Sequence, residues 1–455
     1  MERRSIWDRI PTPALIVLWL LAIAFGAVMV FQAFFNPATS QDVPATAPTP
    51  TAVIVVRSVA TATAPAPAEQ PGEPAAPDSN PAPVLSEGEG PQPTIAPLLD
   101  PSMEFGIQSN ALTGDPGYAI DLIRDRLLLG WVKQQLRWGD FSPAPGQMDW
   151  SGFDRVVDAA SAKDIRVLLS IVTAPTWSRP GVEGVEGPPN DMNEYAKFVG
   201  EAVDRYKGKV QAIEIWNEQN IDSEWKTNPQ AVSHEQYVEM LKLAYQAIKA
   251  RDPNVMVISG ALSPTGFFGG GCDARGCDDQ PYLKRMVELG FLNYADCVGV
   301  HVNGYNLPPQ YRHDEGYNDP TAFFRGTFDN PHPSWSFRST LEDYHNIIGK
   351  QKPLCVTEFG WAAYEGIGTT ALPSYEYGLD NTAEEQAQWD ADAFRLMREW
   401  GFVKLAMLFN LDFAQKSPQG AQDRTAPWSI TDLQGLERPA LRAVRRFMKE
   451  VLGIP

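Results

Sequence analysis

Apolar residues are unevenly distributed along the chain: one uninterrupted block lies near the N-terminus, a depleted stretch follows it, and short apolar runs recur from there on. The short runs predict eight strands: Phe105–Ser109, Val132–Trp138, Arg166–Val172, Val210–Trp216, Val255–Gly260, Val298–Val302, Leu354–Glu358 and Lys404–Leu411. Segments with helical spacing lie between or after them: Trp150–Ala162, Met192–Tyr206, Ser233–Arg251, Tyr282–Leu289, Phe337–Ile348, Thr382–Trp400 and Pro439–Val451. Apolar strands that alternate with helices are typical of a parallel sheet covered on both faces.

This alternation predicts the fold of residues 101–455. Eight strand–helix units in about 355 residues fit a closed (β/α)8 TIM barrel with insertions. An open, doubly wound α/β sheet is the alternative, but no Gly-x-Gly-x-x-Gly turn follows the first strand. We therefore expect an α/β barrel as the folded domain.

The N-terminal apolar block predicts a membrane anchor. Residues Pro13 to Phe35 contain no charge, and a helix of that length spans a bilayer core of about 30 Å. Three arginines precede the block and no Lys or Arg follows it until Arg57, so residues 1–12 should be cytoplasmic and the rest of the chain extracellular at the cell membrane. A cleaved signal peptide is the alternative, because Ala22-Ile23-Ala24 has the small-x-small form, which would make the protein secreted.

Residues 36–100 are rich in Pro, Ala and Thr and nearly free of aromatic side chains. Such a segment cannot bury enough apolar surface to fold, so it predicts a disordered, semi-rigid linker. The whole chain carries a net charge of −18, and no cluster of Lys and Arg stands out. Nucleic acid is therefore not an expected partner.

The four cysteines fall into two pairs, and an exported domain permits disulfides. Cys272 and Cys277 bracket a short glycine-containing loop and could close a small ring. Zinc is the rival interpretation, but no second Cys or His pair stands at ligand spacing.

Cys297 and Cys355 lie in consecutive predicted strands, four residues before His301 and three before Glu358. If His301 and Glu358 both face one pocket, regular strand alternation places the two thiols on opposite faces of the sheet. This count predicts two free, buried cysteines.

Two short strings carry the candidate chemistry. Trp216-Asn217-Glu218 closes the fourth predicted strand and Glu358-Phe359-Gly360-Trp361 closes the seventh. In a (β/α)8 barrel the carboxyl ends of the strands form the catalytic face, so the two glutamates should converge on one pocket. A pair of carboxyl groups in a pocket suits cleavage of a glycosidic bond.

Further strings at strand ends make the region from about Glu104 onward resemble a known superfamily. They are Leu136-Arg137-Trp138, Pro145-Gly146-Gln147-Met148-Asp149-Trp150, Ala174-Pro175-Thr176-Trp177 and His301-x-Asn-x-Tyr305. Together with the two glutamate strings, they resemble the clan A, or 4/7, retaining glycoside hydrolases, and within that clan the xylosidase-like and family 39-like subgroup.

The resemblance implies hydrolysis of O-glycosidic bonds in an extracellular oligo- or polysaccharide by double displacement. It implies that Glu218 is the general acid/base, that Glu358 is the nucleophile and that Asn217 contacts the sugar 2-hydroxyl. It implies no cofactor and no metal.

Supporting roles are hypotheses from the residues. Arg137 could hold Glu358 ionised by charge pairing, Tyr305 could donate a hydrogen bond to the same carboxylate, and His301 could orient Glu218; ordinary structural contacts are the alternative for each. Glu214 shares the strand face of Glu218, where an unpaired carboxylate is costly, so we expect it to be buried and partnered.

Aromatic side chains at the expected catalytic face are candidates for stacking on sugar rings: Trp138, Trp177, Trp361 and Trp428. Core packing is as good an explanation for each of them. The long aromatic segment Asn306 to Trp335 has no regular period and should shape the cleft. The sequence leaves open the sugar, the linkage, the choice between internal and terminal cleavage, and the oligomeric state.

Two other classes of function fit parts of the pattern. An anchored carbohydrate-binding protein on an inactive barrel would not need both glutamates. A metal-dependent barrel hydrolase would need more ligands than five histidines, with no His-x-His in the first strand, supply.

Overall fold

The computed structural model describes residues 103–319 and 332–455. The predicted cytoplasmic segment 1–12, membrane helix 13–35 and linker 36–100 lie outside these residues. Within the described ranges, no helix is both long enough and apolar enough to cross a membrane.

Eight parallel strands form one sheet in the order β5-β4-β3-β2-β1-β10-β9-β8. They are β1 (Glu104–Gln108), β2 (Trp131–Arg137), β3 (Arg166–Val172), β4 (Ala212–Ile215), β5 (Met256–Ser259), β8 (Val298–Asn303), β9 (Leu354–Gly360) and β10 (Val403–Leu408). Parallel bridges from Ile258 to Cys297 and from Leu262 to Val300 join the two edge strands and close the sheet. The expected eight-stranded barrel is confirmed, and each strand begins and ends within three residues of its predicted bounds.

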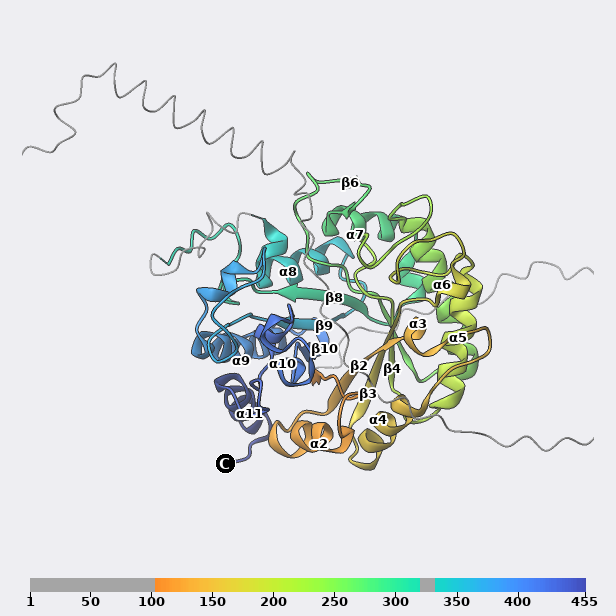
Figure 1. Ribbon diagram of the computed structural model, residues 1–455. Coiled ribbons are helices and arrows are strands. Elements are labelled where there is room, and N and C mark those ends of the chain that lie inside the picture. The colour runs from red at the N-terminus through yellow and green to blue at the C-terminus, as the bar shows by residue number, and fades with distance from the viewer. Residues whose placement is uncertain (1–102, 320–331) are drawn as a thin grey trace, which may run out of the picture. The chain divides into compact units, whose positions relative to one another are not determined.

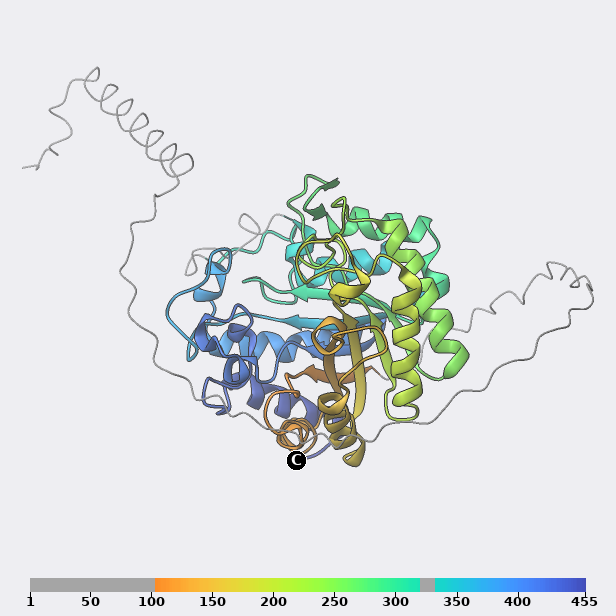
Figure 2. The ribbon, with the colours of Figure 1, turned by 45° about the vertical axis from the view of Figure 1, so that its right-hand side comes forward.

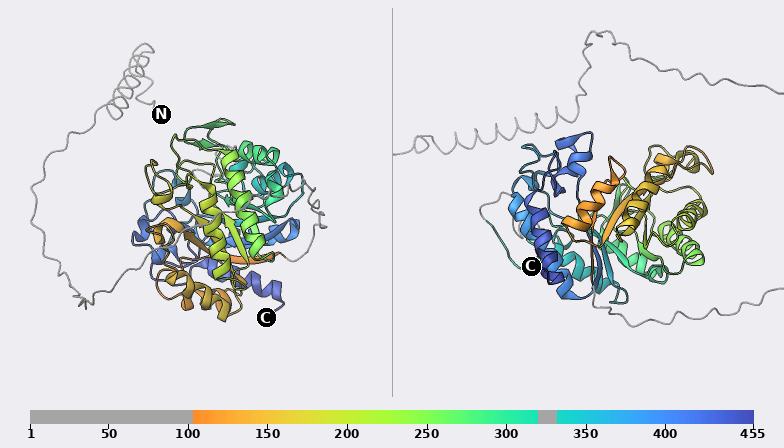
Figure 3. Two further views of the ribbon diagram at one scale, coloured as in Figure 1. Left: turned by 90° about the vertical axis from the view of Figure 1, so that its right-hand side faces the viewer. Right: turned by 90° about the horizontal axis from the view of Figure 1, so that it is seen from below.

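Helices surround the strands on the outside (Figure 1), with α5 and α6 packed side by side (Figure 2) and the C-terminal helix α11 packed against α9 (Figure 3). They are α2 (Pro116–Asp121), α4 (Ser151–Ala162), α5 (Met192–Arg205), α6 (His234–Arg251), α7 (Asp279–Glu288), α8 (Phe337–Ile347), α9 (Ala383–Trp400) and α11 (Pro439–Leu452). Two further one-turn helices, α3 (Trp138–Phe141) and α10 (Phe413–Lys416), follow β2 and β10.

Local sequence signals fix the ends of these helices. Thr382 and Glu385 form a reciprocal capping box at the start of α9, which satisfies backbone N–H groups that have no partner within the helix. The same helix ends at Gly401, whose φ of 71° is a left-handed conformation that glycine adopts without steric penalty.

The amino-terminal half of the barrel interior is filled by apolar side chains, which we call the lower layer. It consists of Trp131, Leu168, Ala212, Ile258, Cys297, Cys355, Leu405 and Met407. Gly106 in β1 makes room for this layer, because a Cβ at that position would collide with Met407 and Trp131.

The first cysteine prediction is confirmed. Cys272 and Cys277 form a disulfide across the small hairpin of β6 (Cys272–Asp273) and β7 (Gly276–Cys277).

The second cysteine prediction is wrong, because Cys297 and Cys355 form a disulfide inside the barrel rather than remaining free. The cause is an irregularity in β9. Val300 pairs with Val356, but the next residue, His301, pairs with Glu358, so Thr357 is an extra residue in the ladder. A β-bulge of this kind breaks the alternation of faces, and both Cys355 and Glu358 can then point into the barrel.

Candidate active site

A cleft of about 830 Å³ opens at the carboxyl ends of the strands. Its lining includes residues from or just after seven of the eight strands: Gln108, Arg137, Glu218, Ser263, Asn303, Glu358 and Phe409 among them. Both candidate glutamates therefore face the same cavity.

An unusual backbone conformation turns Glu218 into the cleft directly after β4. Trp216 and Glu218 have φ values of 77° and 47°, in the left-handed region that residues other than glycine rarely adopt. The Glu218 N–H donates to the carbonyl of Ala261 at 2.8 Å, which ties this turn to the segment after β5. Strained positions of this kind persist where the surroundings fix them, and they cluster at functional sites.

Glu358 is paired with a lysine that the sequence analysis did not select. The fully buried Lys133 Nζ lies 2.9 Å from Glu358 Oε1 and 3.1 Å from Glu214 Oε2. Burial lowers the pKa of Lys133, but the charges of Glu214 and Glu358 outweigh it, and the pKa lies above its ordinary value. Lys133 is therefore the cation in contact with Glu358.

Glu214 is buried and partnered, as predicted. Besides its ion pair with Lys133, it accepts a hydrogen bond from Thr357 Oγ1 at 2.6 Å. Lys133, Glu214, Glu358 and Thr357 form what we call the upper layer of the barrel interior.

His301, at the end of β8, lies between the two glutamates. Its Nδ1 is 3.1 Å from Glu218 Oε1 and 3.7 Å from Glu358 Oε2. Since both distances start from one nitrogen, these carboxylate oxygens lie no farther apart than the sum of the two distances, which allows the roughly 5–5.5 Å separation of a retaining pair.

Burial raises the pKa of Glu218, but the hydrogen bond and charge of His301, with a smaller contribution from Arg424, outweigh burial and lower it below its ordinary value. Burial lowers the pKa of His301, but the charge of Glu358 and the hydrogen bond with Glu218 outweigh burial and raise it. The unliganded pair therefore favours the proton on His301.

Two supporting hypotheses are wrong in their contacts. Arg137 lines the cleft but pairs with Glu186 at 2.5 Å and Asp140 at 2.9 Å, rather than with Glu358. Lys133, four residues earlier on the same face of the strand, contacts Glu358 instead. Tyr305 also lines the cleft, but its hydroxyl makes no hydrogen bond with Glu358.

The four candidate tryptophans differ in whether they line the cleft. Trp428 lines the cleft. Trp138 follows the inward Arg137 in β2 and therefore points outward, where it stacks on Phe198 with a centroid distance of 4.6 Å. Trp177 packs edge-on against Trp138, and Trp361 is fully buried.

Other aromatic residues contribute more to the cleft walls than the tryptophans that the sequence singled out. They are Phe267, Trp335, Tyr375, Tyr377, Phe409 and Phe413. The long segment that was expected to shape the cleft contributes its two end residues, Asn306 and Trp335, and its residues 320–331 lie outside the described part.

A third carboxyl group in the cleft, Glu224, was not expected. Burial, reinforced by the charges of Glu218 and Glu186, raises the pKa of Glu224 to about 8. At neutral pH this group is therefore mostly protonated.

One group of potential metal ligands occurs among the described residues. It consists of His234, Cys272 and Cys277, away from the cleft lining, and two of its three members form a disulfide.

No family model matches the chain. Solved structures, however, match the fold of the chain. The barrel is built like those of known glycoside hydrolases. It is similar to a family 39 glycoside hydrolase from the gut symbiont Bacteroides cellulosilyticus WH2, at 18% identity and a TM-score of 0.53, covering 78% of this chain and 65% of that one.

A glucosidase from Croceicoccus marinus matches at 15% identity and a TM-score of 0.51, covering 75% of this chain and 66% of that one. Xylanase 10B from Thermotoga petrophila RKU-1, solved with xylobiose, matches at 15% identity and a TM-score of 0.50, covering 77% of this chain and 95% of that one. The chain thus spans slightly less than two thirds of the first two relatives. Likeness at these identities shows a common fold.

Proposed function

We propose that the protein is a retaining glycoside hydrolase in which Glu218 is the general acid/base and Glu358 the nucleophile. The observation that carries the proposal is the convergence of these two carboxylates, from different strands, on His301 at the carboxyl ends of the barrel strands. The glycoside hydrolase-like fold supports it.

In the first step, a carboxylate oxygen of Glu358 attacks the anomeric carbon, the bond to the leaving oxygen breaks, and Glu218 gives that oxygen a proton. The attack neutralises Glu358, which removes one of the charges that raise the pKa of His301. The proton can then pass from Nδ1 of His301 to Glu218 and on to the leaving group.

In the second step, Glu218 takes a proton from water, the water oxygen attacks the anomeric carbon, and Glu358 leaves as a carboxylate. Lys133 stabilises this restored negative charge, because its ammonium group contacts Glu358 and is shielded from solvent.

Two residues suit substrate contact. The buried Oδ1 of Asn217 has no hydrogen-bond partner among the described residues, so it can accept a hydrogen bond from a sugar hydroxyl. Phe267 lines the cleft and is 61% exposed, so its ring is open to stacking on the apolar face of a sugar, whereas Trp428 is only 4% exposed.

We further propose that this domain is held at the outer face of the cell membrane by residues 13–35. The support is the uncharged run and the arginines before it. Full-length protein should sediment with membranes, and protease treatment of intact cells should release an active domain. A soluble secreted form shortened near Ala24 would contradict the anchor.

Leaving-group dependence tests the roles of the glutamates. Glu358→Ala should reduce turnover of every glycoside roughly 10⁴-fold or more, since the glycosyl–enzyme intermediate cannot form. Glu218→Ala should lose turnover of unactivated glycosides but still react once with a dinitrophenyl glycoside, whose phenolate leaves without protonation.

The matched control is Glu201→Ala, which removes an exposed carboxylate from the outer surface of α5 and should leave both activities unchanged. Binding of carbohydrate without hydrolysis of any aryl or natural glycoside would instead indicate an inactive, carbohydrate-binding barrel.

A further inference from the structure

Two arginines line the cleft, and their surroundings differ. Arg137 is neutralised by two carboxylates, Glu186 and Asp140. Arg424 is exposed, and its guanidinium makes no hydrogen bond or ion pair with the part of the chain that the structure describes. An arginine in a substrate cleft with all five of its N–H donors unused is available to a ligand.

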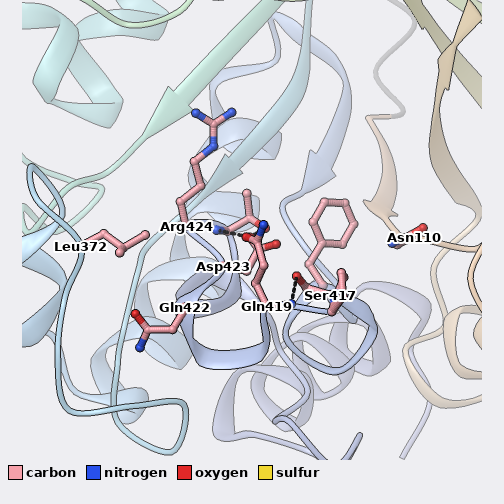
Figure 4. Close-up of a pocket in the computed structure, with 10 residues that line it drawn as sticks. Asn110, Leu372, Ser417, Gln419, Gln422, Asp423 and Arg424 are labelled. Carbon is pink, nitrogen blue, oxygen red and sulfur yellow. Dashed lines mark hydrogen bonds between the residues drawn. The ribbon is translucent and has the colours of Figure 1, made fainter. Parts of the chain in front are cut away.

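A second cavity of about 440 Å³ adjoins the cleft and shares Phe413, Arg424 and Thr425 with it. Its other lining residues are mostly polar and include Gln419 and Asp423. Figure 4 shows the Arg424 side chain extending away from these residues rather than folding back onto them. The arginine therefore lines both of the adjoining cavities.

The charge of Arg424 contributes to lowering the pKa of Asp423, the nearest carboxylate in sequence, but the two side chains form no ion pair. Asp423 accepts hydrogen bonds from the Thr425 N–H at 2.7 Å and from the Thr425 hydroxyl at 2.5 Å. Its oxygens thus hold the local turn in place, and the guanidinium is left for another anion.

Part of the negative charge near Arg424 is neutralised, while the exposed Glu376 also lines the cleft. Lys133 offsets the charge of Glu358, and the pKa of about 8 keeps Glu224 mostly neutral at physiological pH. The charge of Arg424 acts on both Glu218 and Glu224, which places it within electrostatic range of the reacting centre. With a net charge of −18 on the chain, an acidic ligand needs such a local cation to bind.

We propose that Arg424 binds an anionic substituent of the sugar chain, a uronate carboxylate or a sulfate ester, and that the substrate is therefore an acidic polysaccharide that extends across both cavities. A planar guanidinium forms two parallel hydrogen bonds with either group, which an ammonium cannot reproduce. This inference rests on the proposed glycoside hydrolase function, because it concerns the substrate of that same cleft.

The test is a binding measurement that does not depend on turnover. Full-length protein carrying Glu358→Gln is titrated calorimetrically with oligosaccharides of glucuronoxylan, polygalacturonate and alginate and with their carboxyl-reduced forms. Oligosaccharides of carrageenan and their desulfated forms make up the sulfate arm. Each acidic oligosaccharide and its neutral form differ in charge and in little else.

Arg424→Gln should weaken binding of the preferred acidic oligosaccharide about tenfold to a hundredfold and leave binding of its neutral form unchanged. Arg424→Lys should recover part of the loss, and the effect should shrink at high salt. The matched control is Arg155→Gln, which removes another exposed arginine without an ion pair, on the outer helix α4, and should change nothing.

Equal binding of the acidic and neutral forms, no binding of any acidic form, or an equal loss on both forms in Arg424→Gln would overturn the inference. Hydrolysis is measured separately with the wild-type chain. Charge-dependent binding without hydrolysis would refute the proposed function alone, whereas hydrolysis of neutral polysaccharides with no dependence on Arg424 would refute this inference alone.

Discussion

The two halves of the barrel interior are built from the same strands but differ in chemistry. The lower layer is apolar and contains the Cys297–Cys355 disulfide, whereas the upper layer buries Lys133 between two carboxylates. In β2 the change occurs within two residues of one strand face, from Trp131 to Lys133.

This difference separates stability from chemistry. Apolar side chains and a disulfide stabilise a fold without further partners, but buried charges cost desolvation energy that their pairing only partly offsets. A protein retains such a charged layer where the charges serve a function other than stability. Here Lys133 contacts Glu358, the nucleophile of the proposed mechanism, so we propose that the lower layer serves stability and the upper layer catalysis.

The largest stability effect should come from removing the cation of the upper layer while its two carboxyl groups remain. Lys133→Met leaves Glu214 and Glu358 without their buried counter-ion, and we expect a loss of about 3–5 kcal/mol in the free energy of unfolding. Urea denaturation measures this loss, and aryl glycoside hydrolysis should fall with it.

A double variant separates the two effects. Lys133→Met combined with Glu214→Gln removes one cation and one anion, so stability should recover while activity stays low, because Glu358 still lacks its cation. Recovery of activity together with stability would show that Lys133 has a structural role only.

A change in the lower layer should reduce stability without reducing activity. Replacing Cys297 and Cys355 together by Ala should reduce the free energy of unfolding by about 2–4 kcal/mol, since the bridge closes a long loop in the unfolded chain. The rate of hydrolysis well below the melting temperature should change less than about threefold, because neither sulfur contacts the cleft. A large loss of activity in a folded double variant would contradict the division into layers.

The smallest effect concerns Glu224 and depends on pH. Its pKa of about 8 in the folded protein lies above the ordinary 4.5, so the folded state keeps a proton that the unfolded chain releases as the pH rises through this window. The stability that Glu224 contributes is complete below pH 4.5 and is lost progressively up to about pH 8.

Glu224→Gln should therefore match the wild type in melting temperature near pH 4 and exceed it by a few degrees at pH 8. Glu201→Gln, on the outer surface of α5, serves as the control and should show no such dependence. A melting difference that does not change with pH would disprove the assigned titration.

Much of this architecture follows from local patterns. Buried parallel strands are nearly continuous apolar runs, which is why all eight were predicted, and Glu218 and Glu358 stand where those runs end. The segment Pro116–Asp121 was missed, because it is a short helix that continues as a single π-helical turn and has no clear helical period of its own.

Contacts across the barrel were harder to predict. Alternation places Lys133 and Arg137 on one face of β2, and the sequence does not say which of them reaches Glu358. Which of the two side chains reaches Glu358 depends on its depth within the barrel, and the stagger of the strands sets that depth. The bulge at Thr357 has no sequence signature of its own, and one inserted residue reverses every inference from strand parity, including the state of Cys355. The raised pKa of Glu224 depends on the whole cleft wall.

The central claim is that Glu358 forms a covalent bond to the sugar, and trapping that bond tests it most directly. Glu218→Ala is incubated with dinitrophenyl glycosides of several sugars, followed by intact-protein mass spectrometry and peptide mapping. We expect one glycosyl residue to accumulate on the peptide that contains Glu358, because the water that should release it lacks a general base, and wild-type hydrolysis followed by NMR should retain the anomeric configuration. An inverted product, or full wild-type activity in Glu358→Ala, would contradict the account.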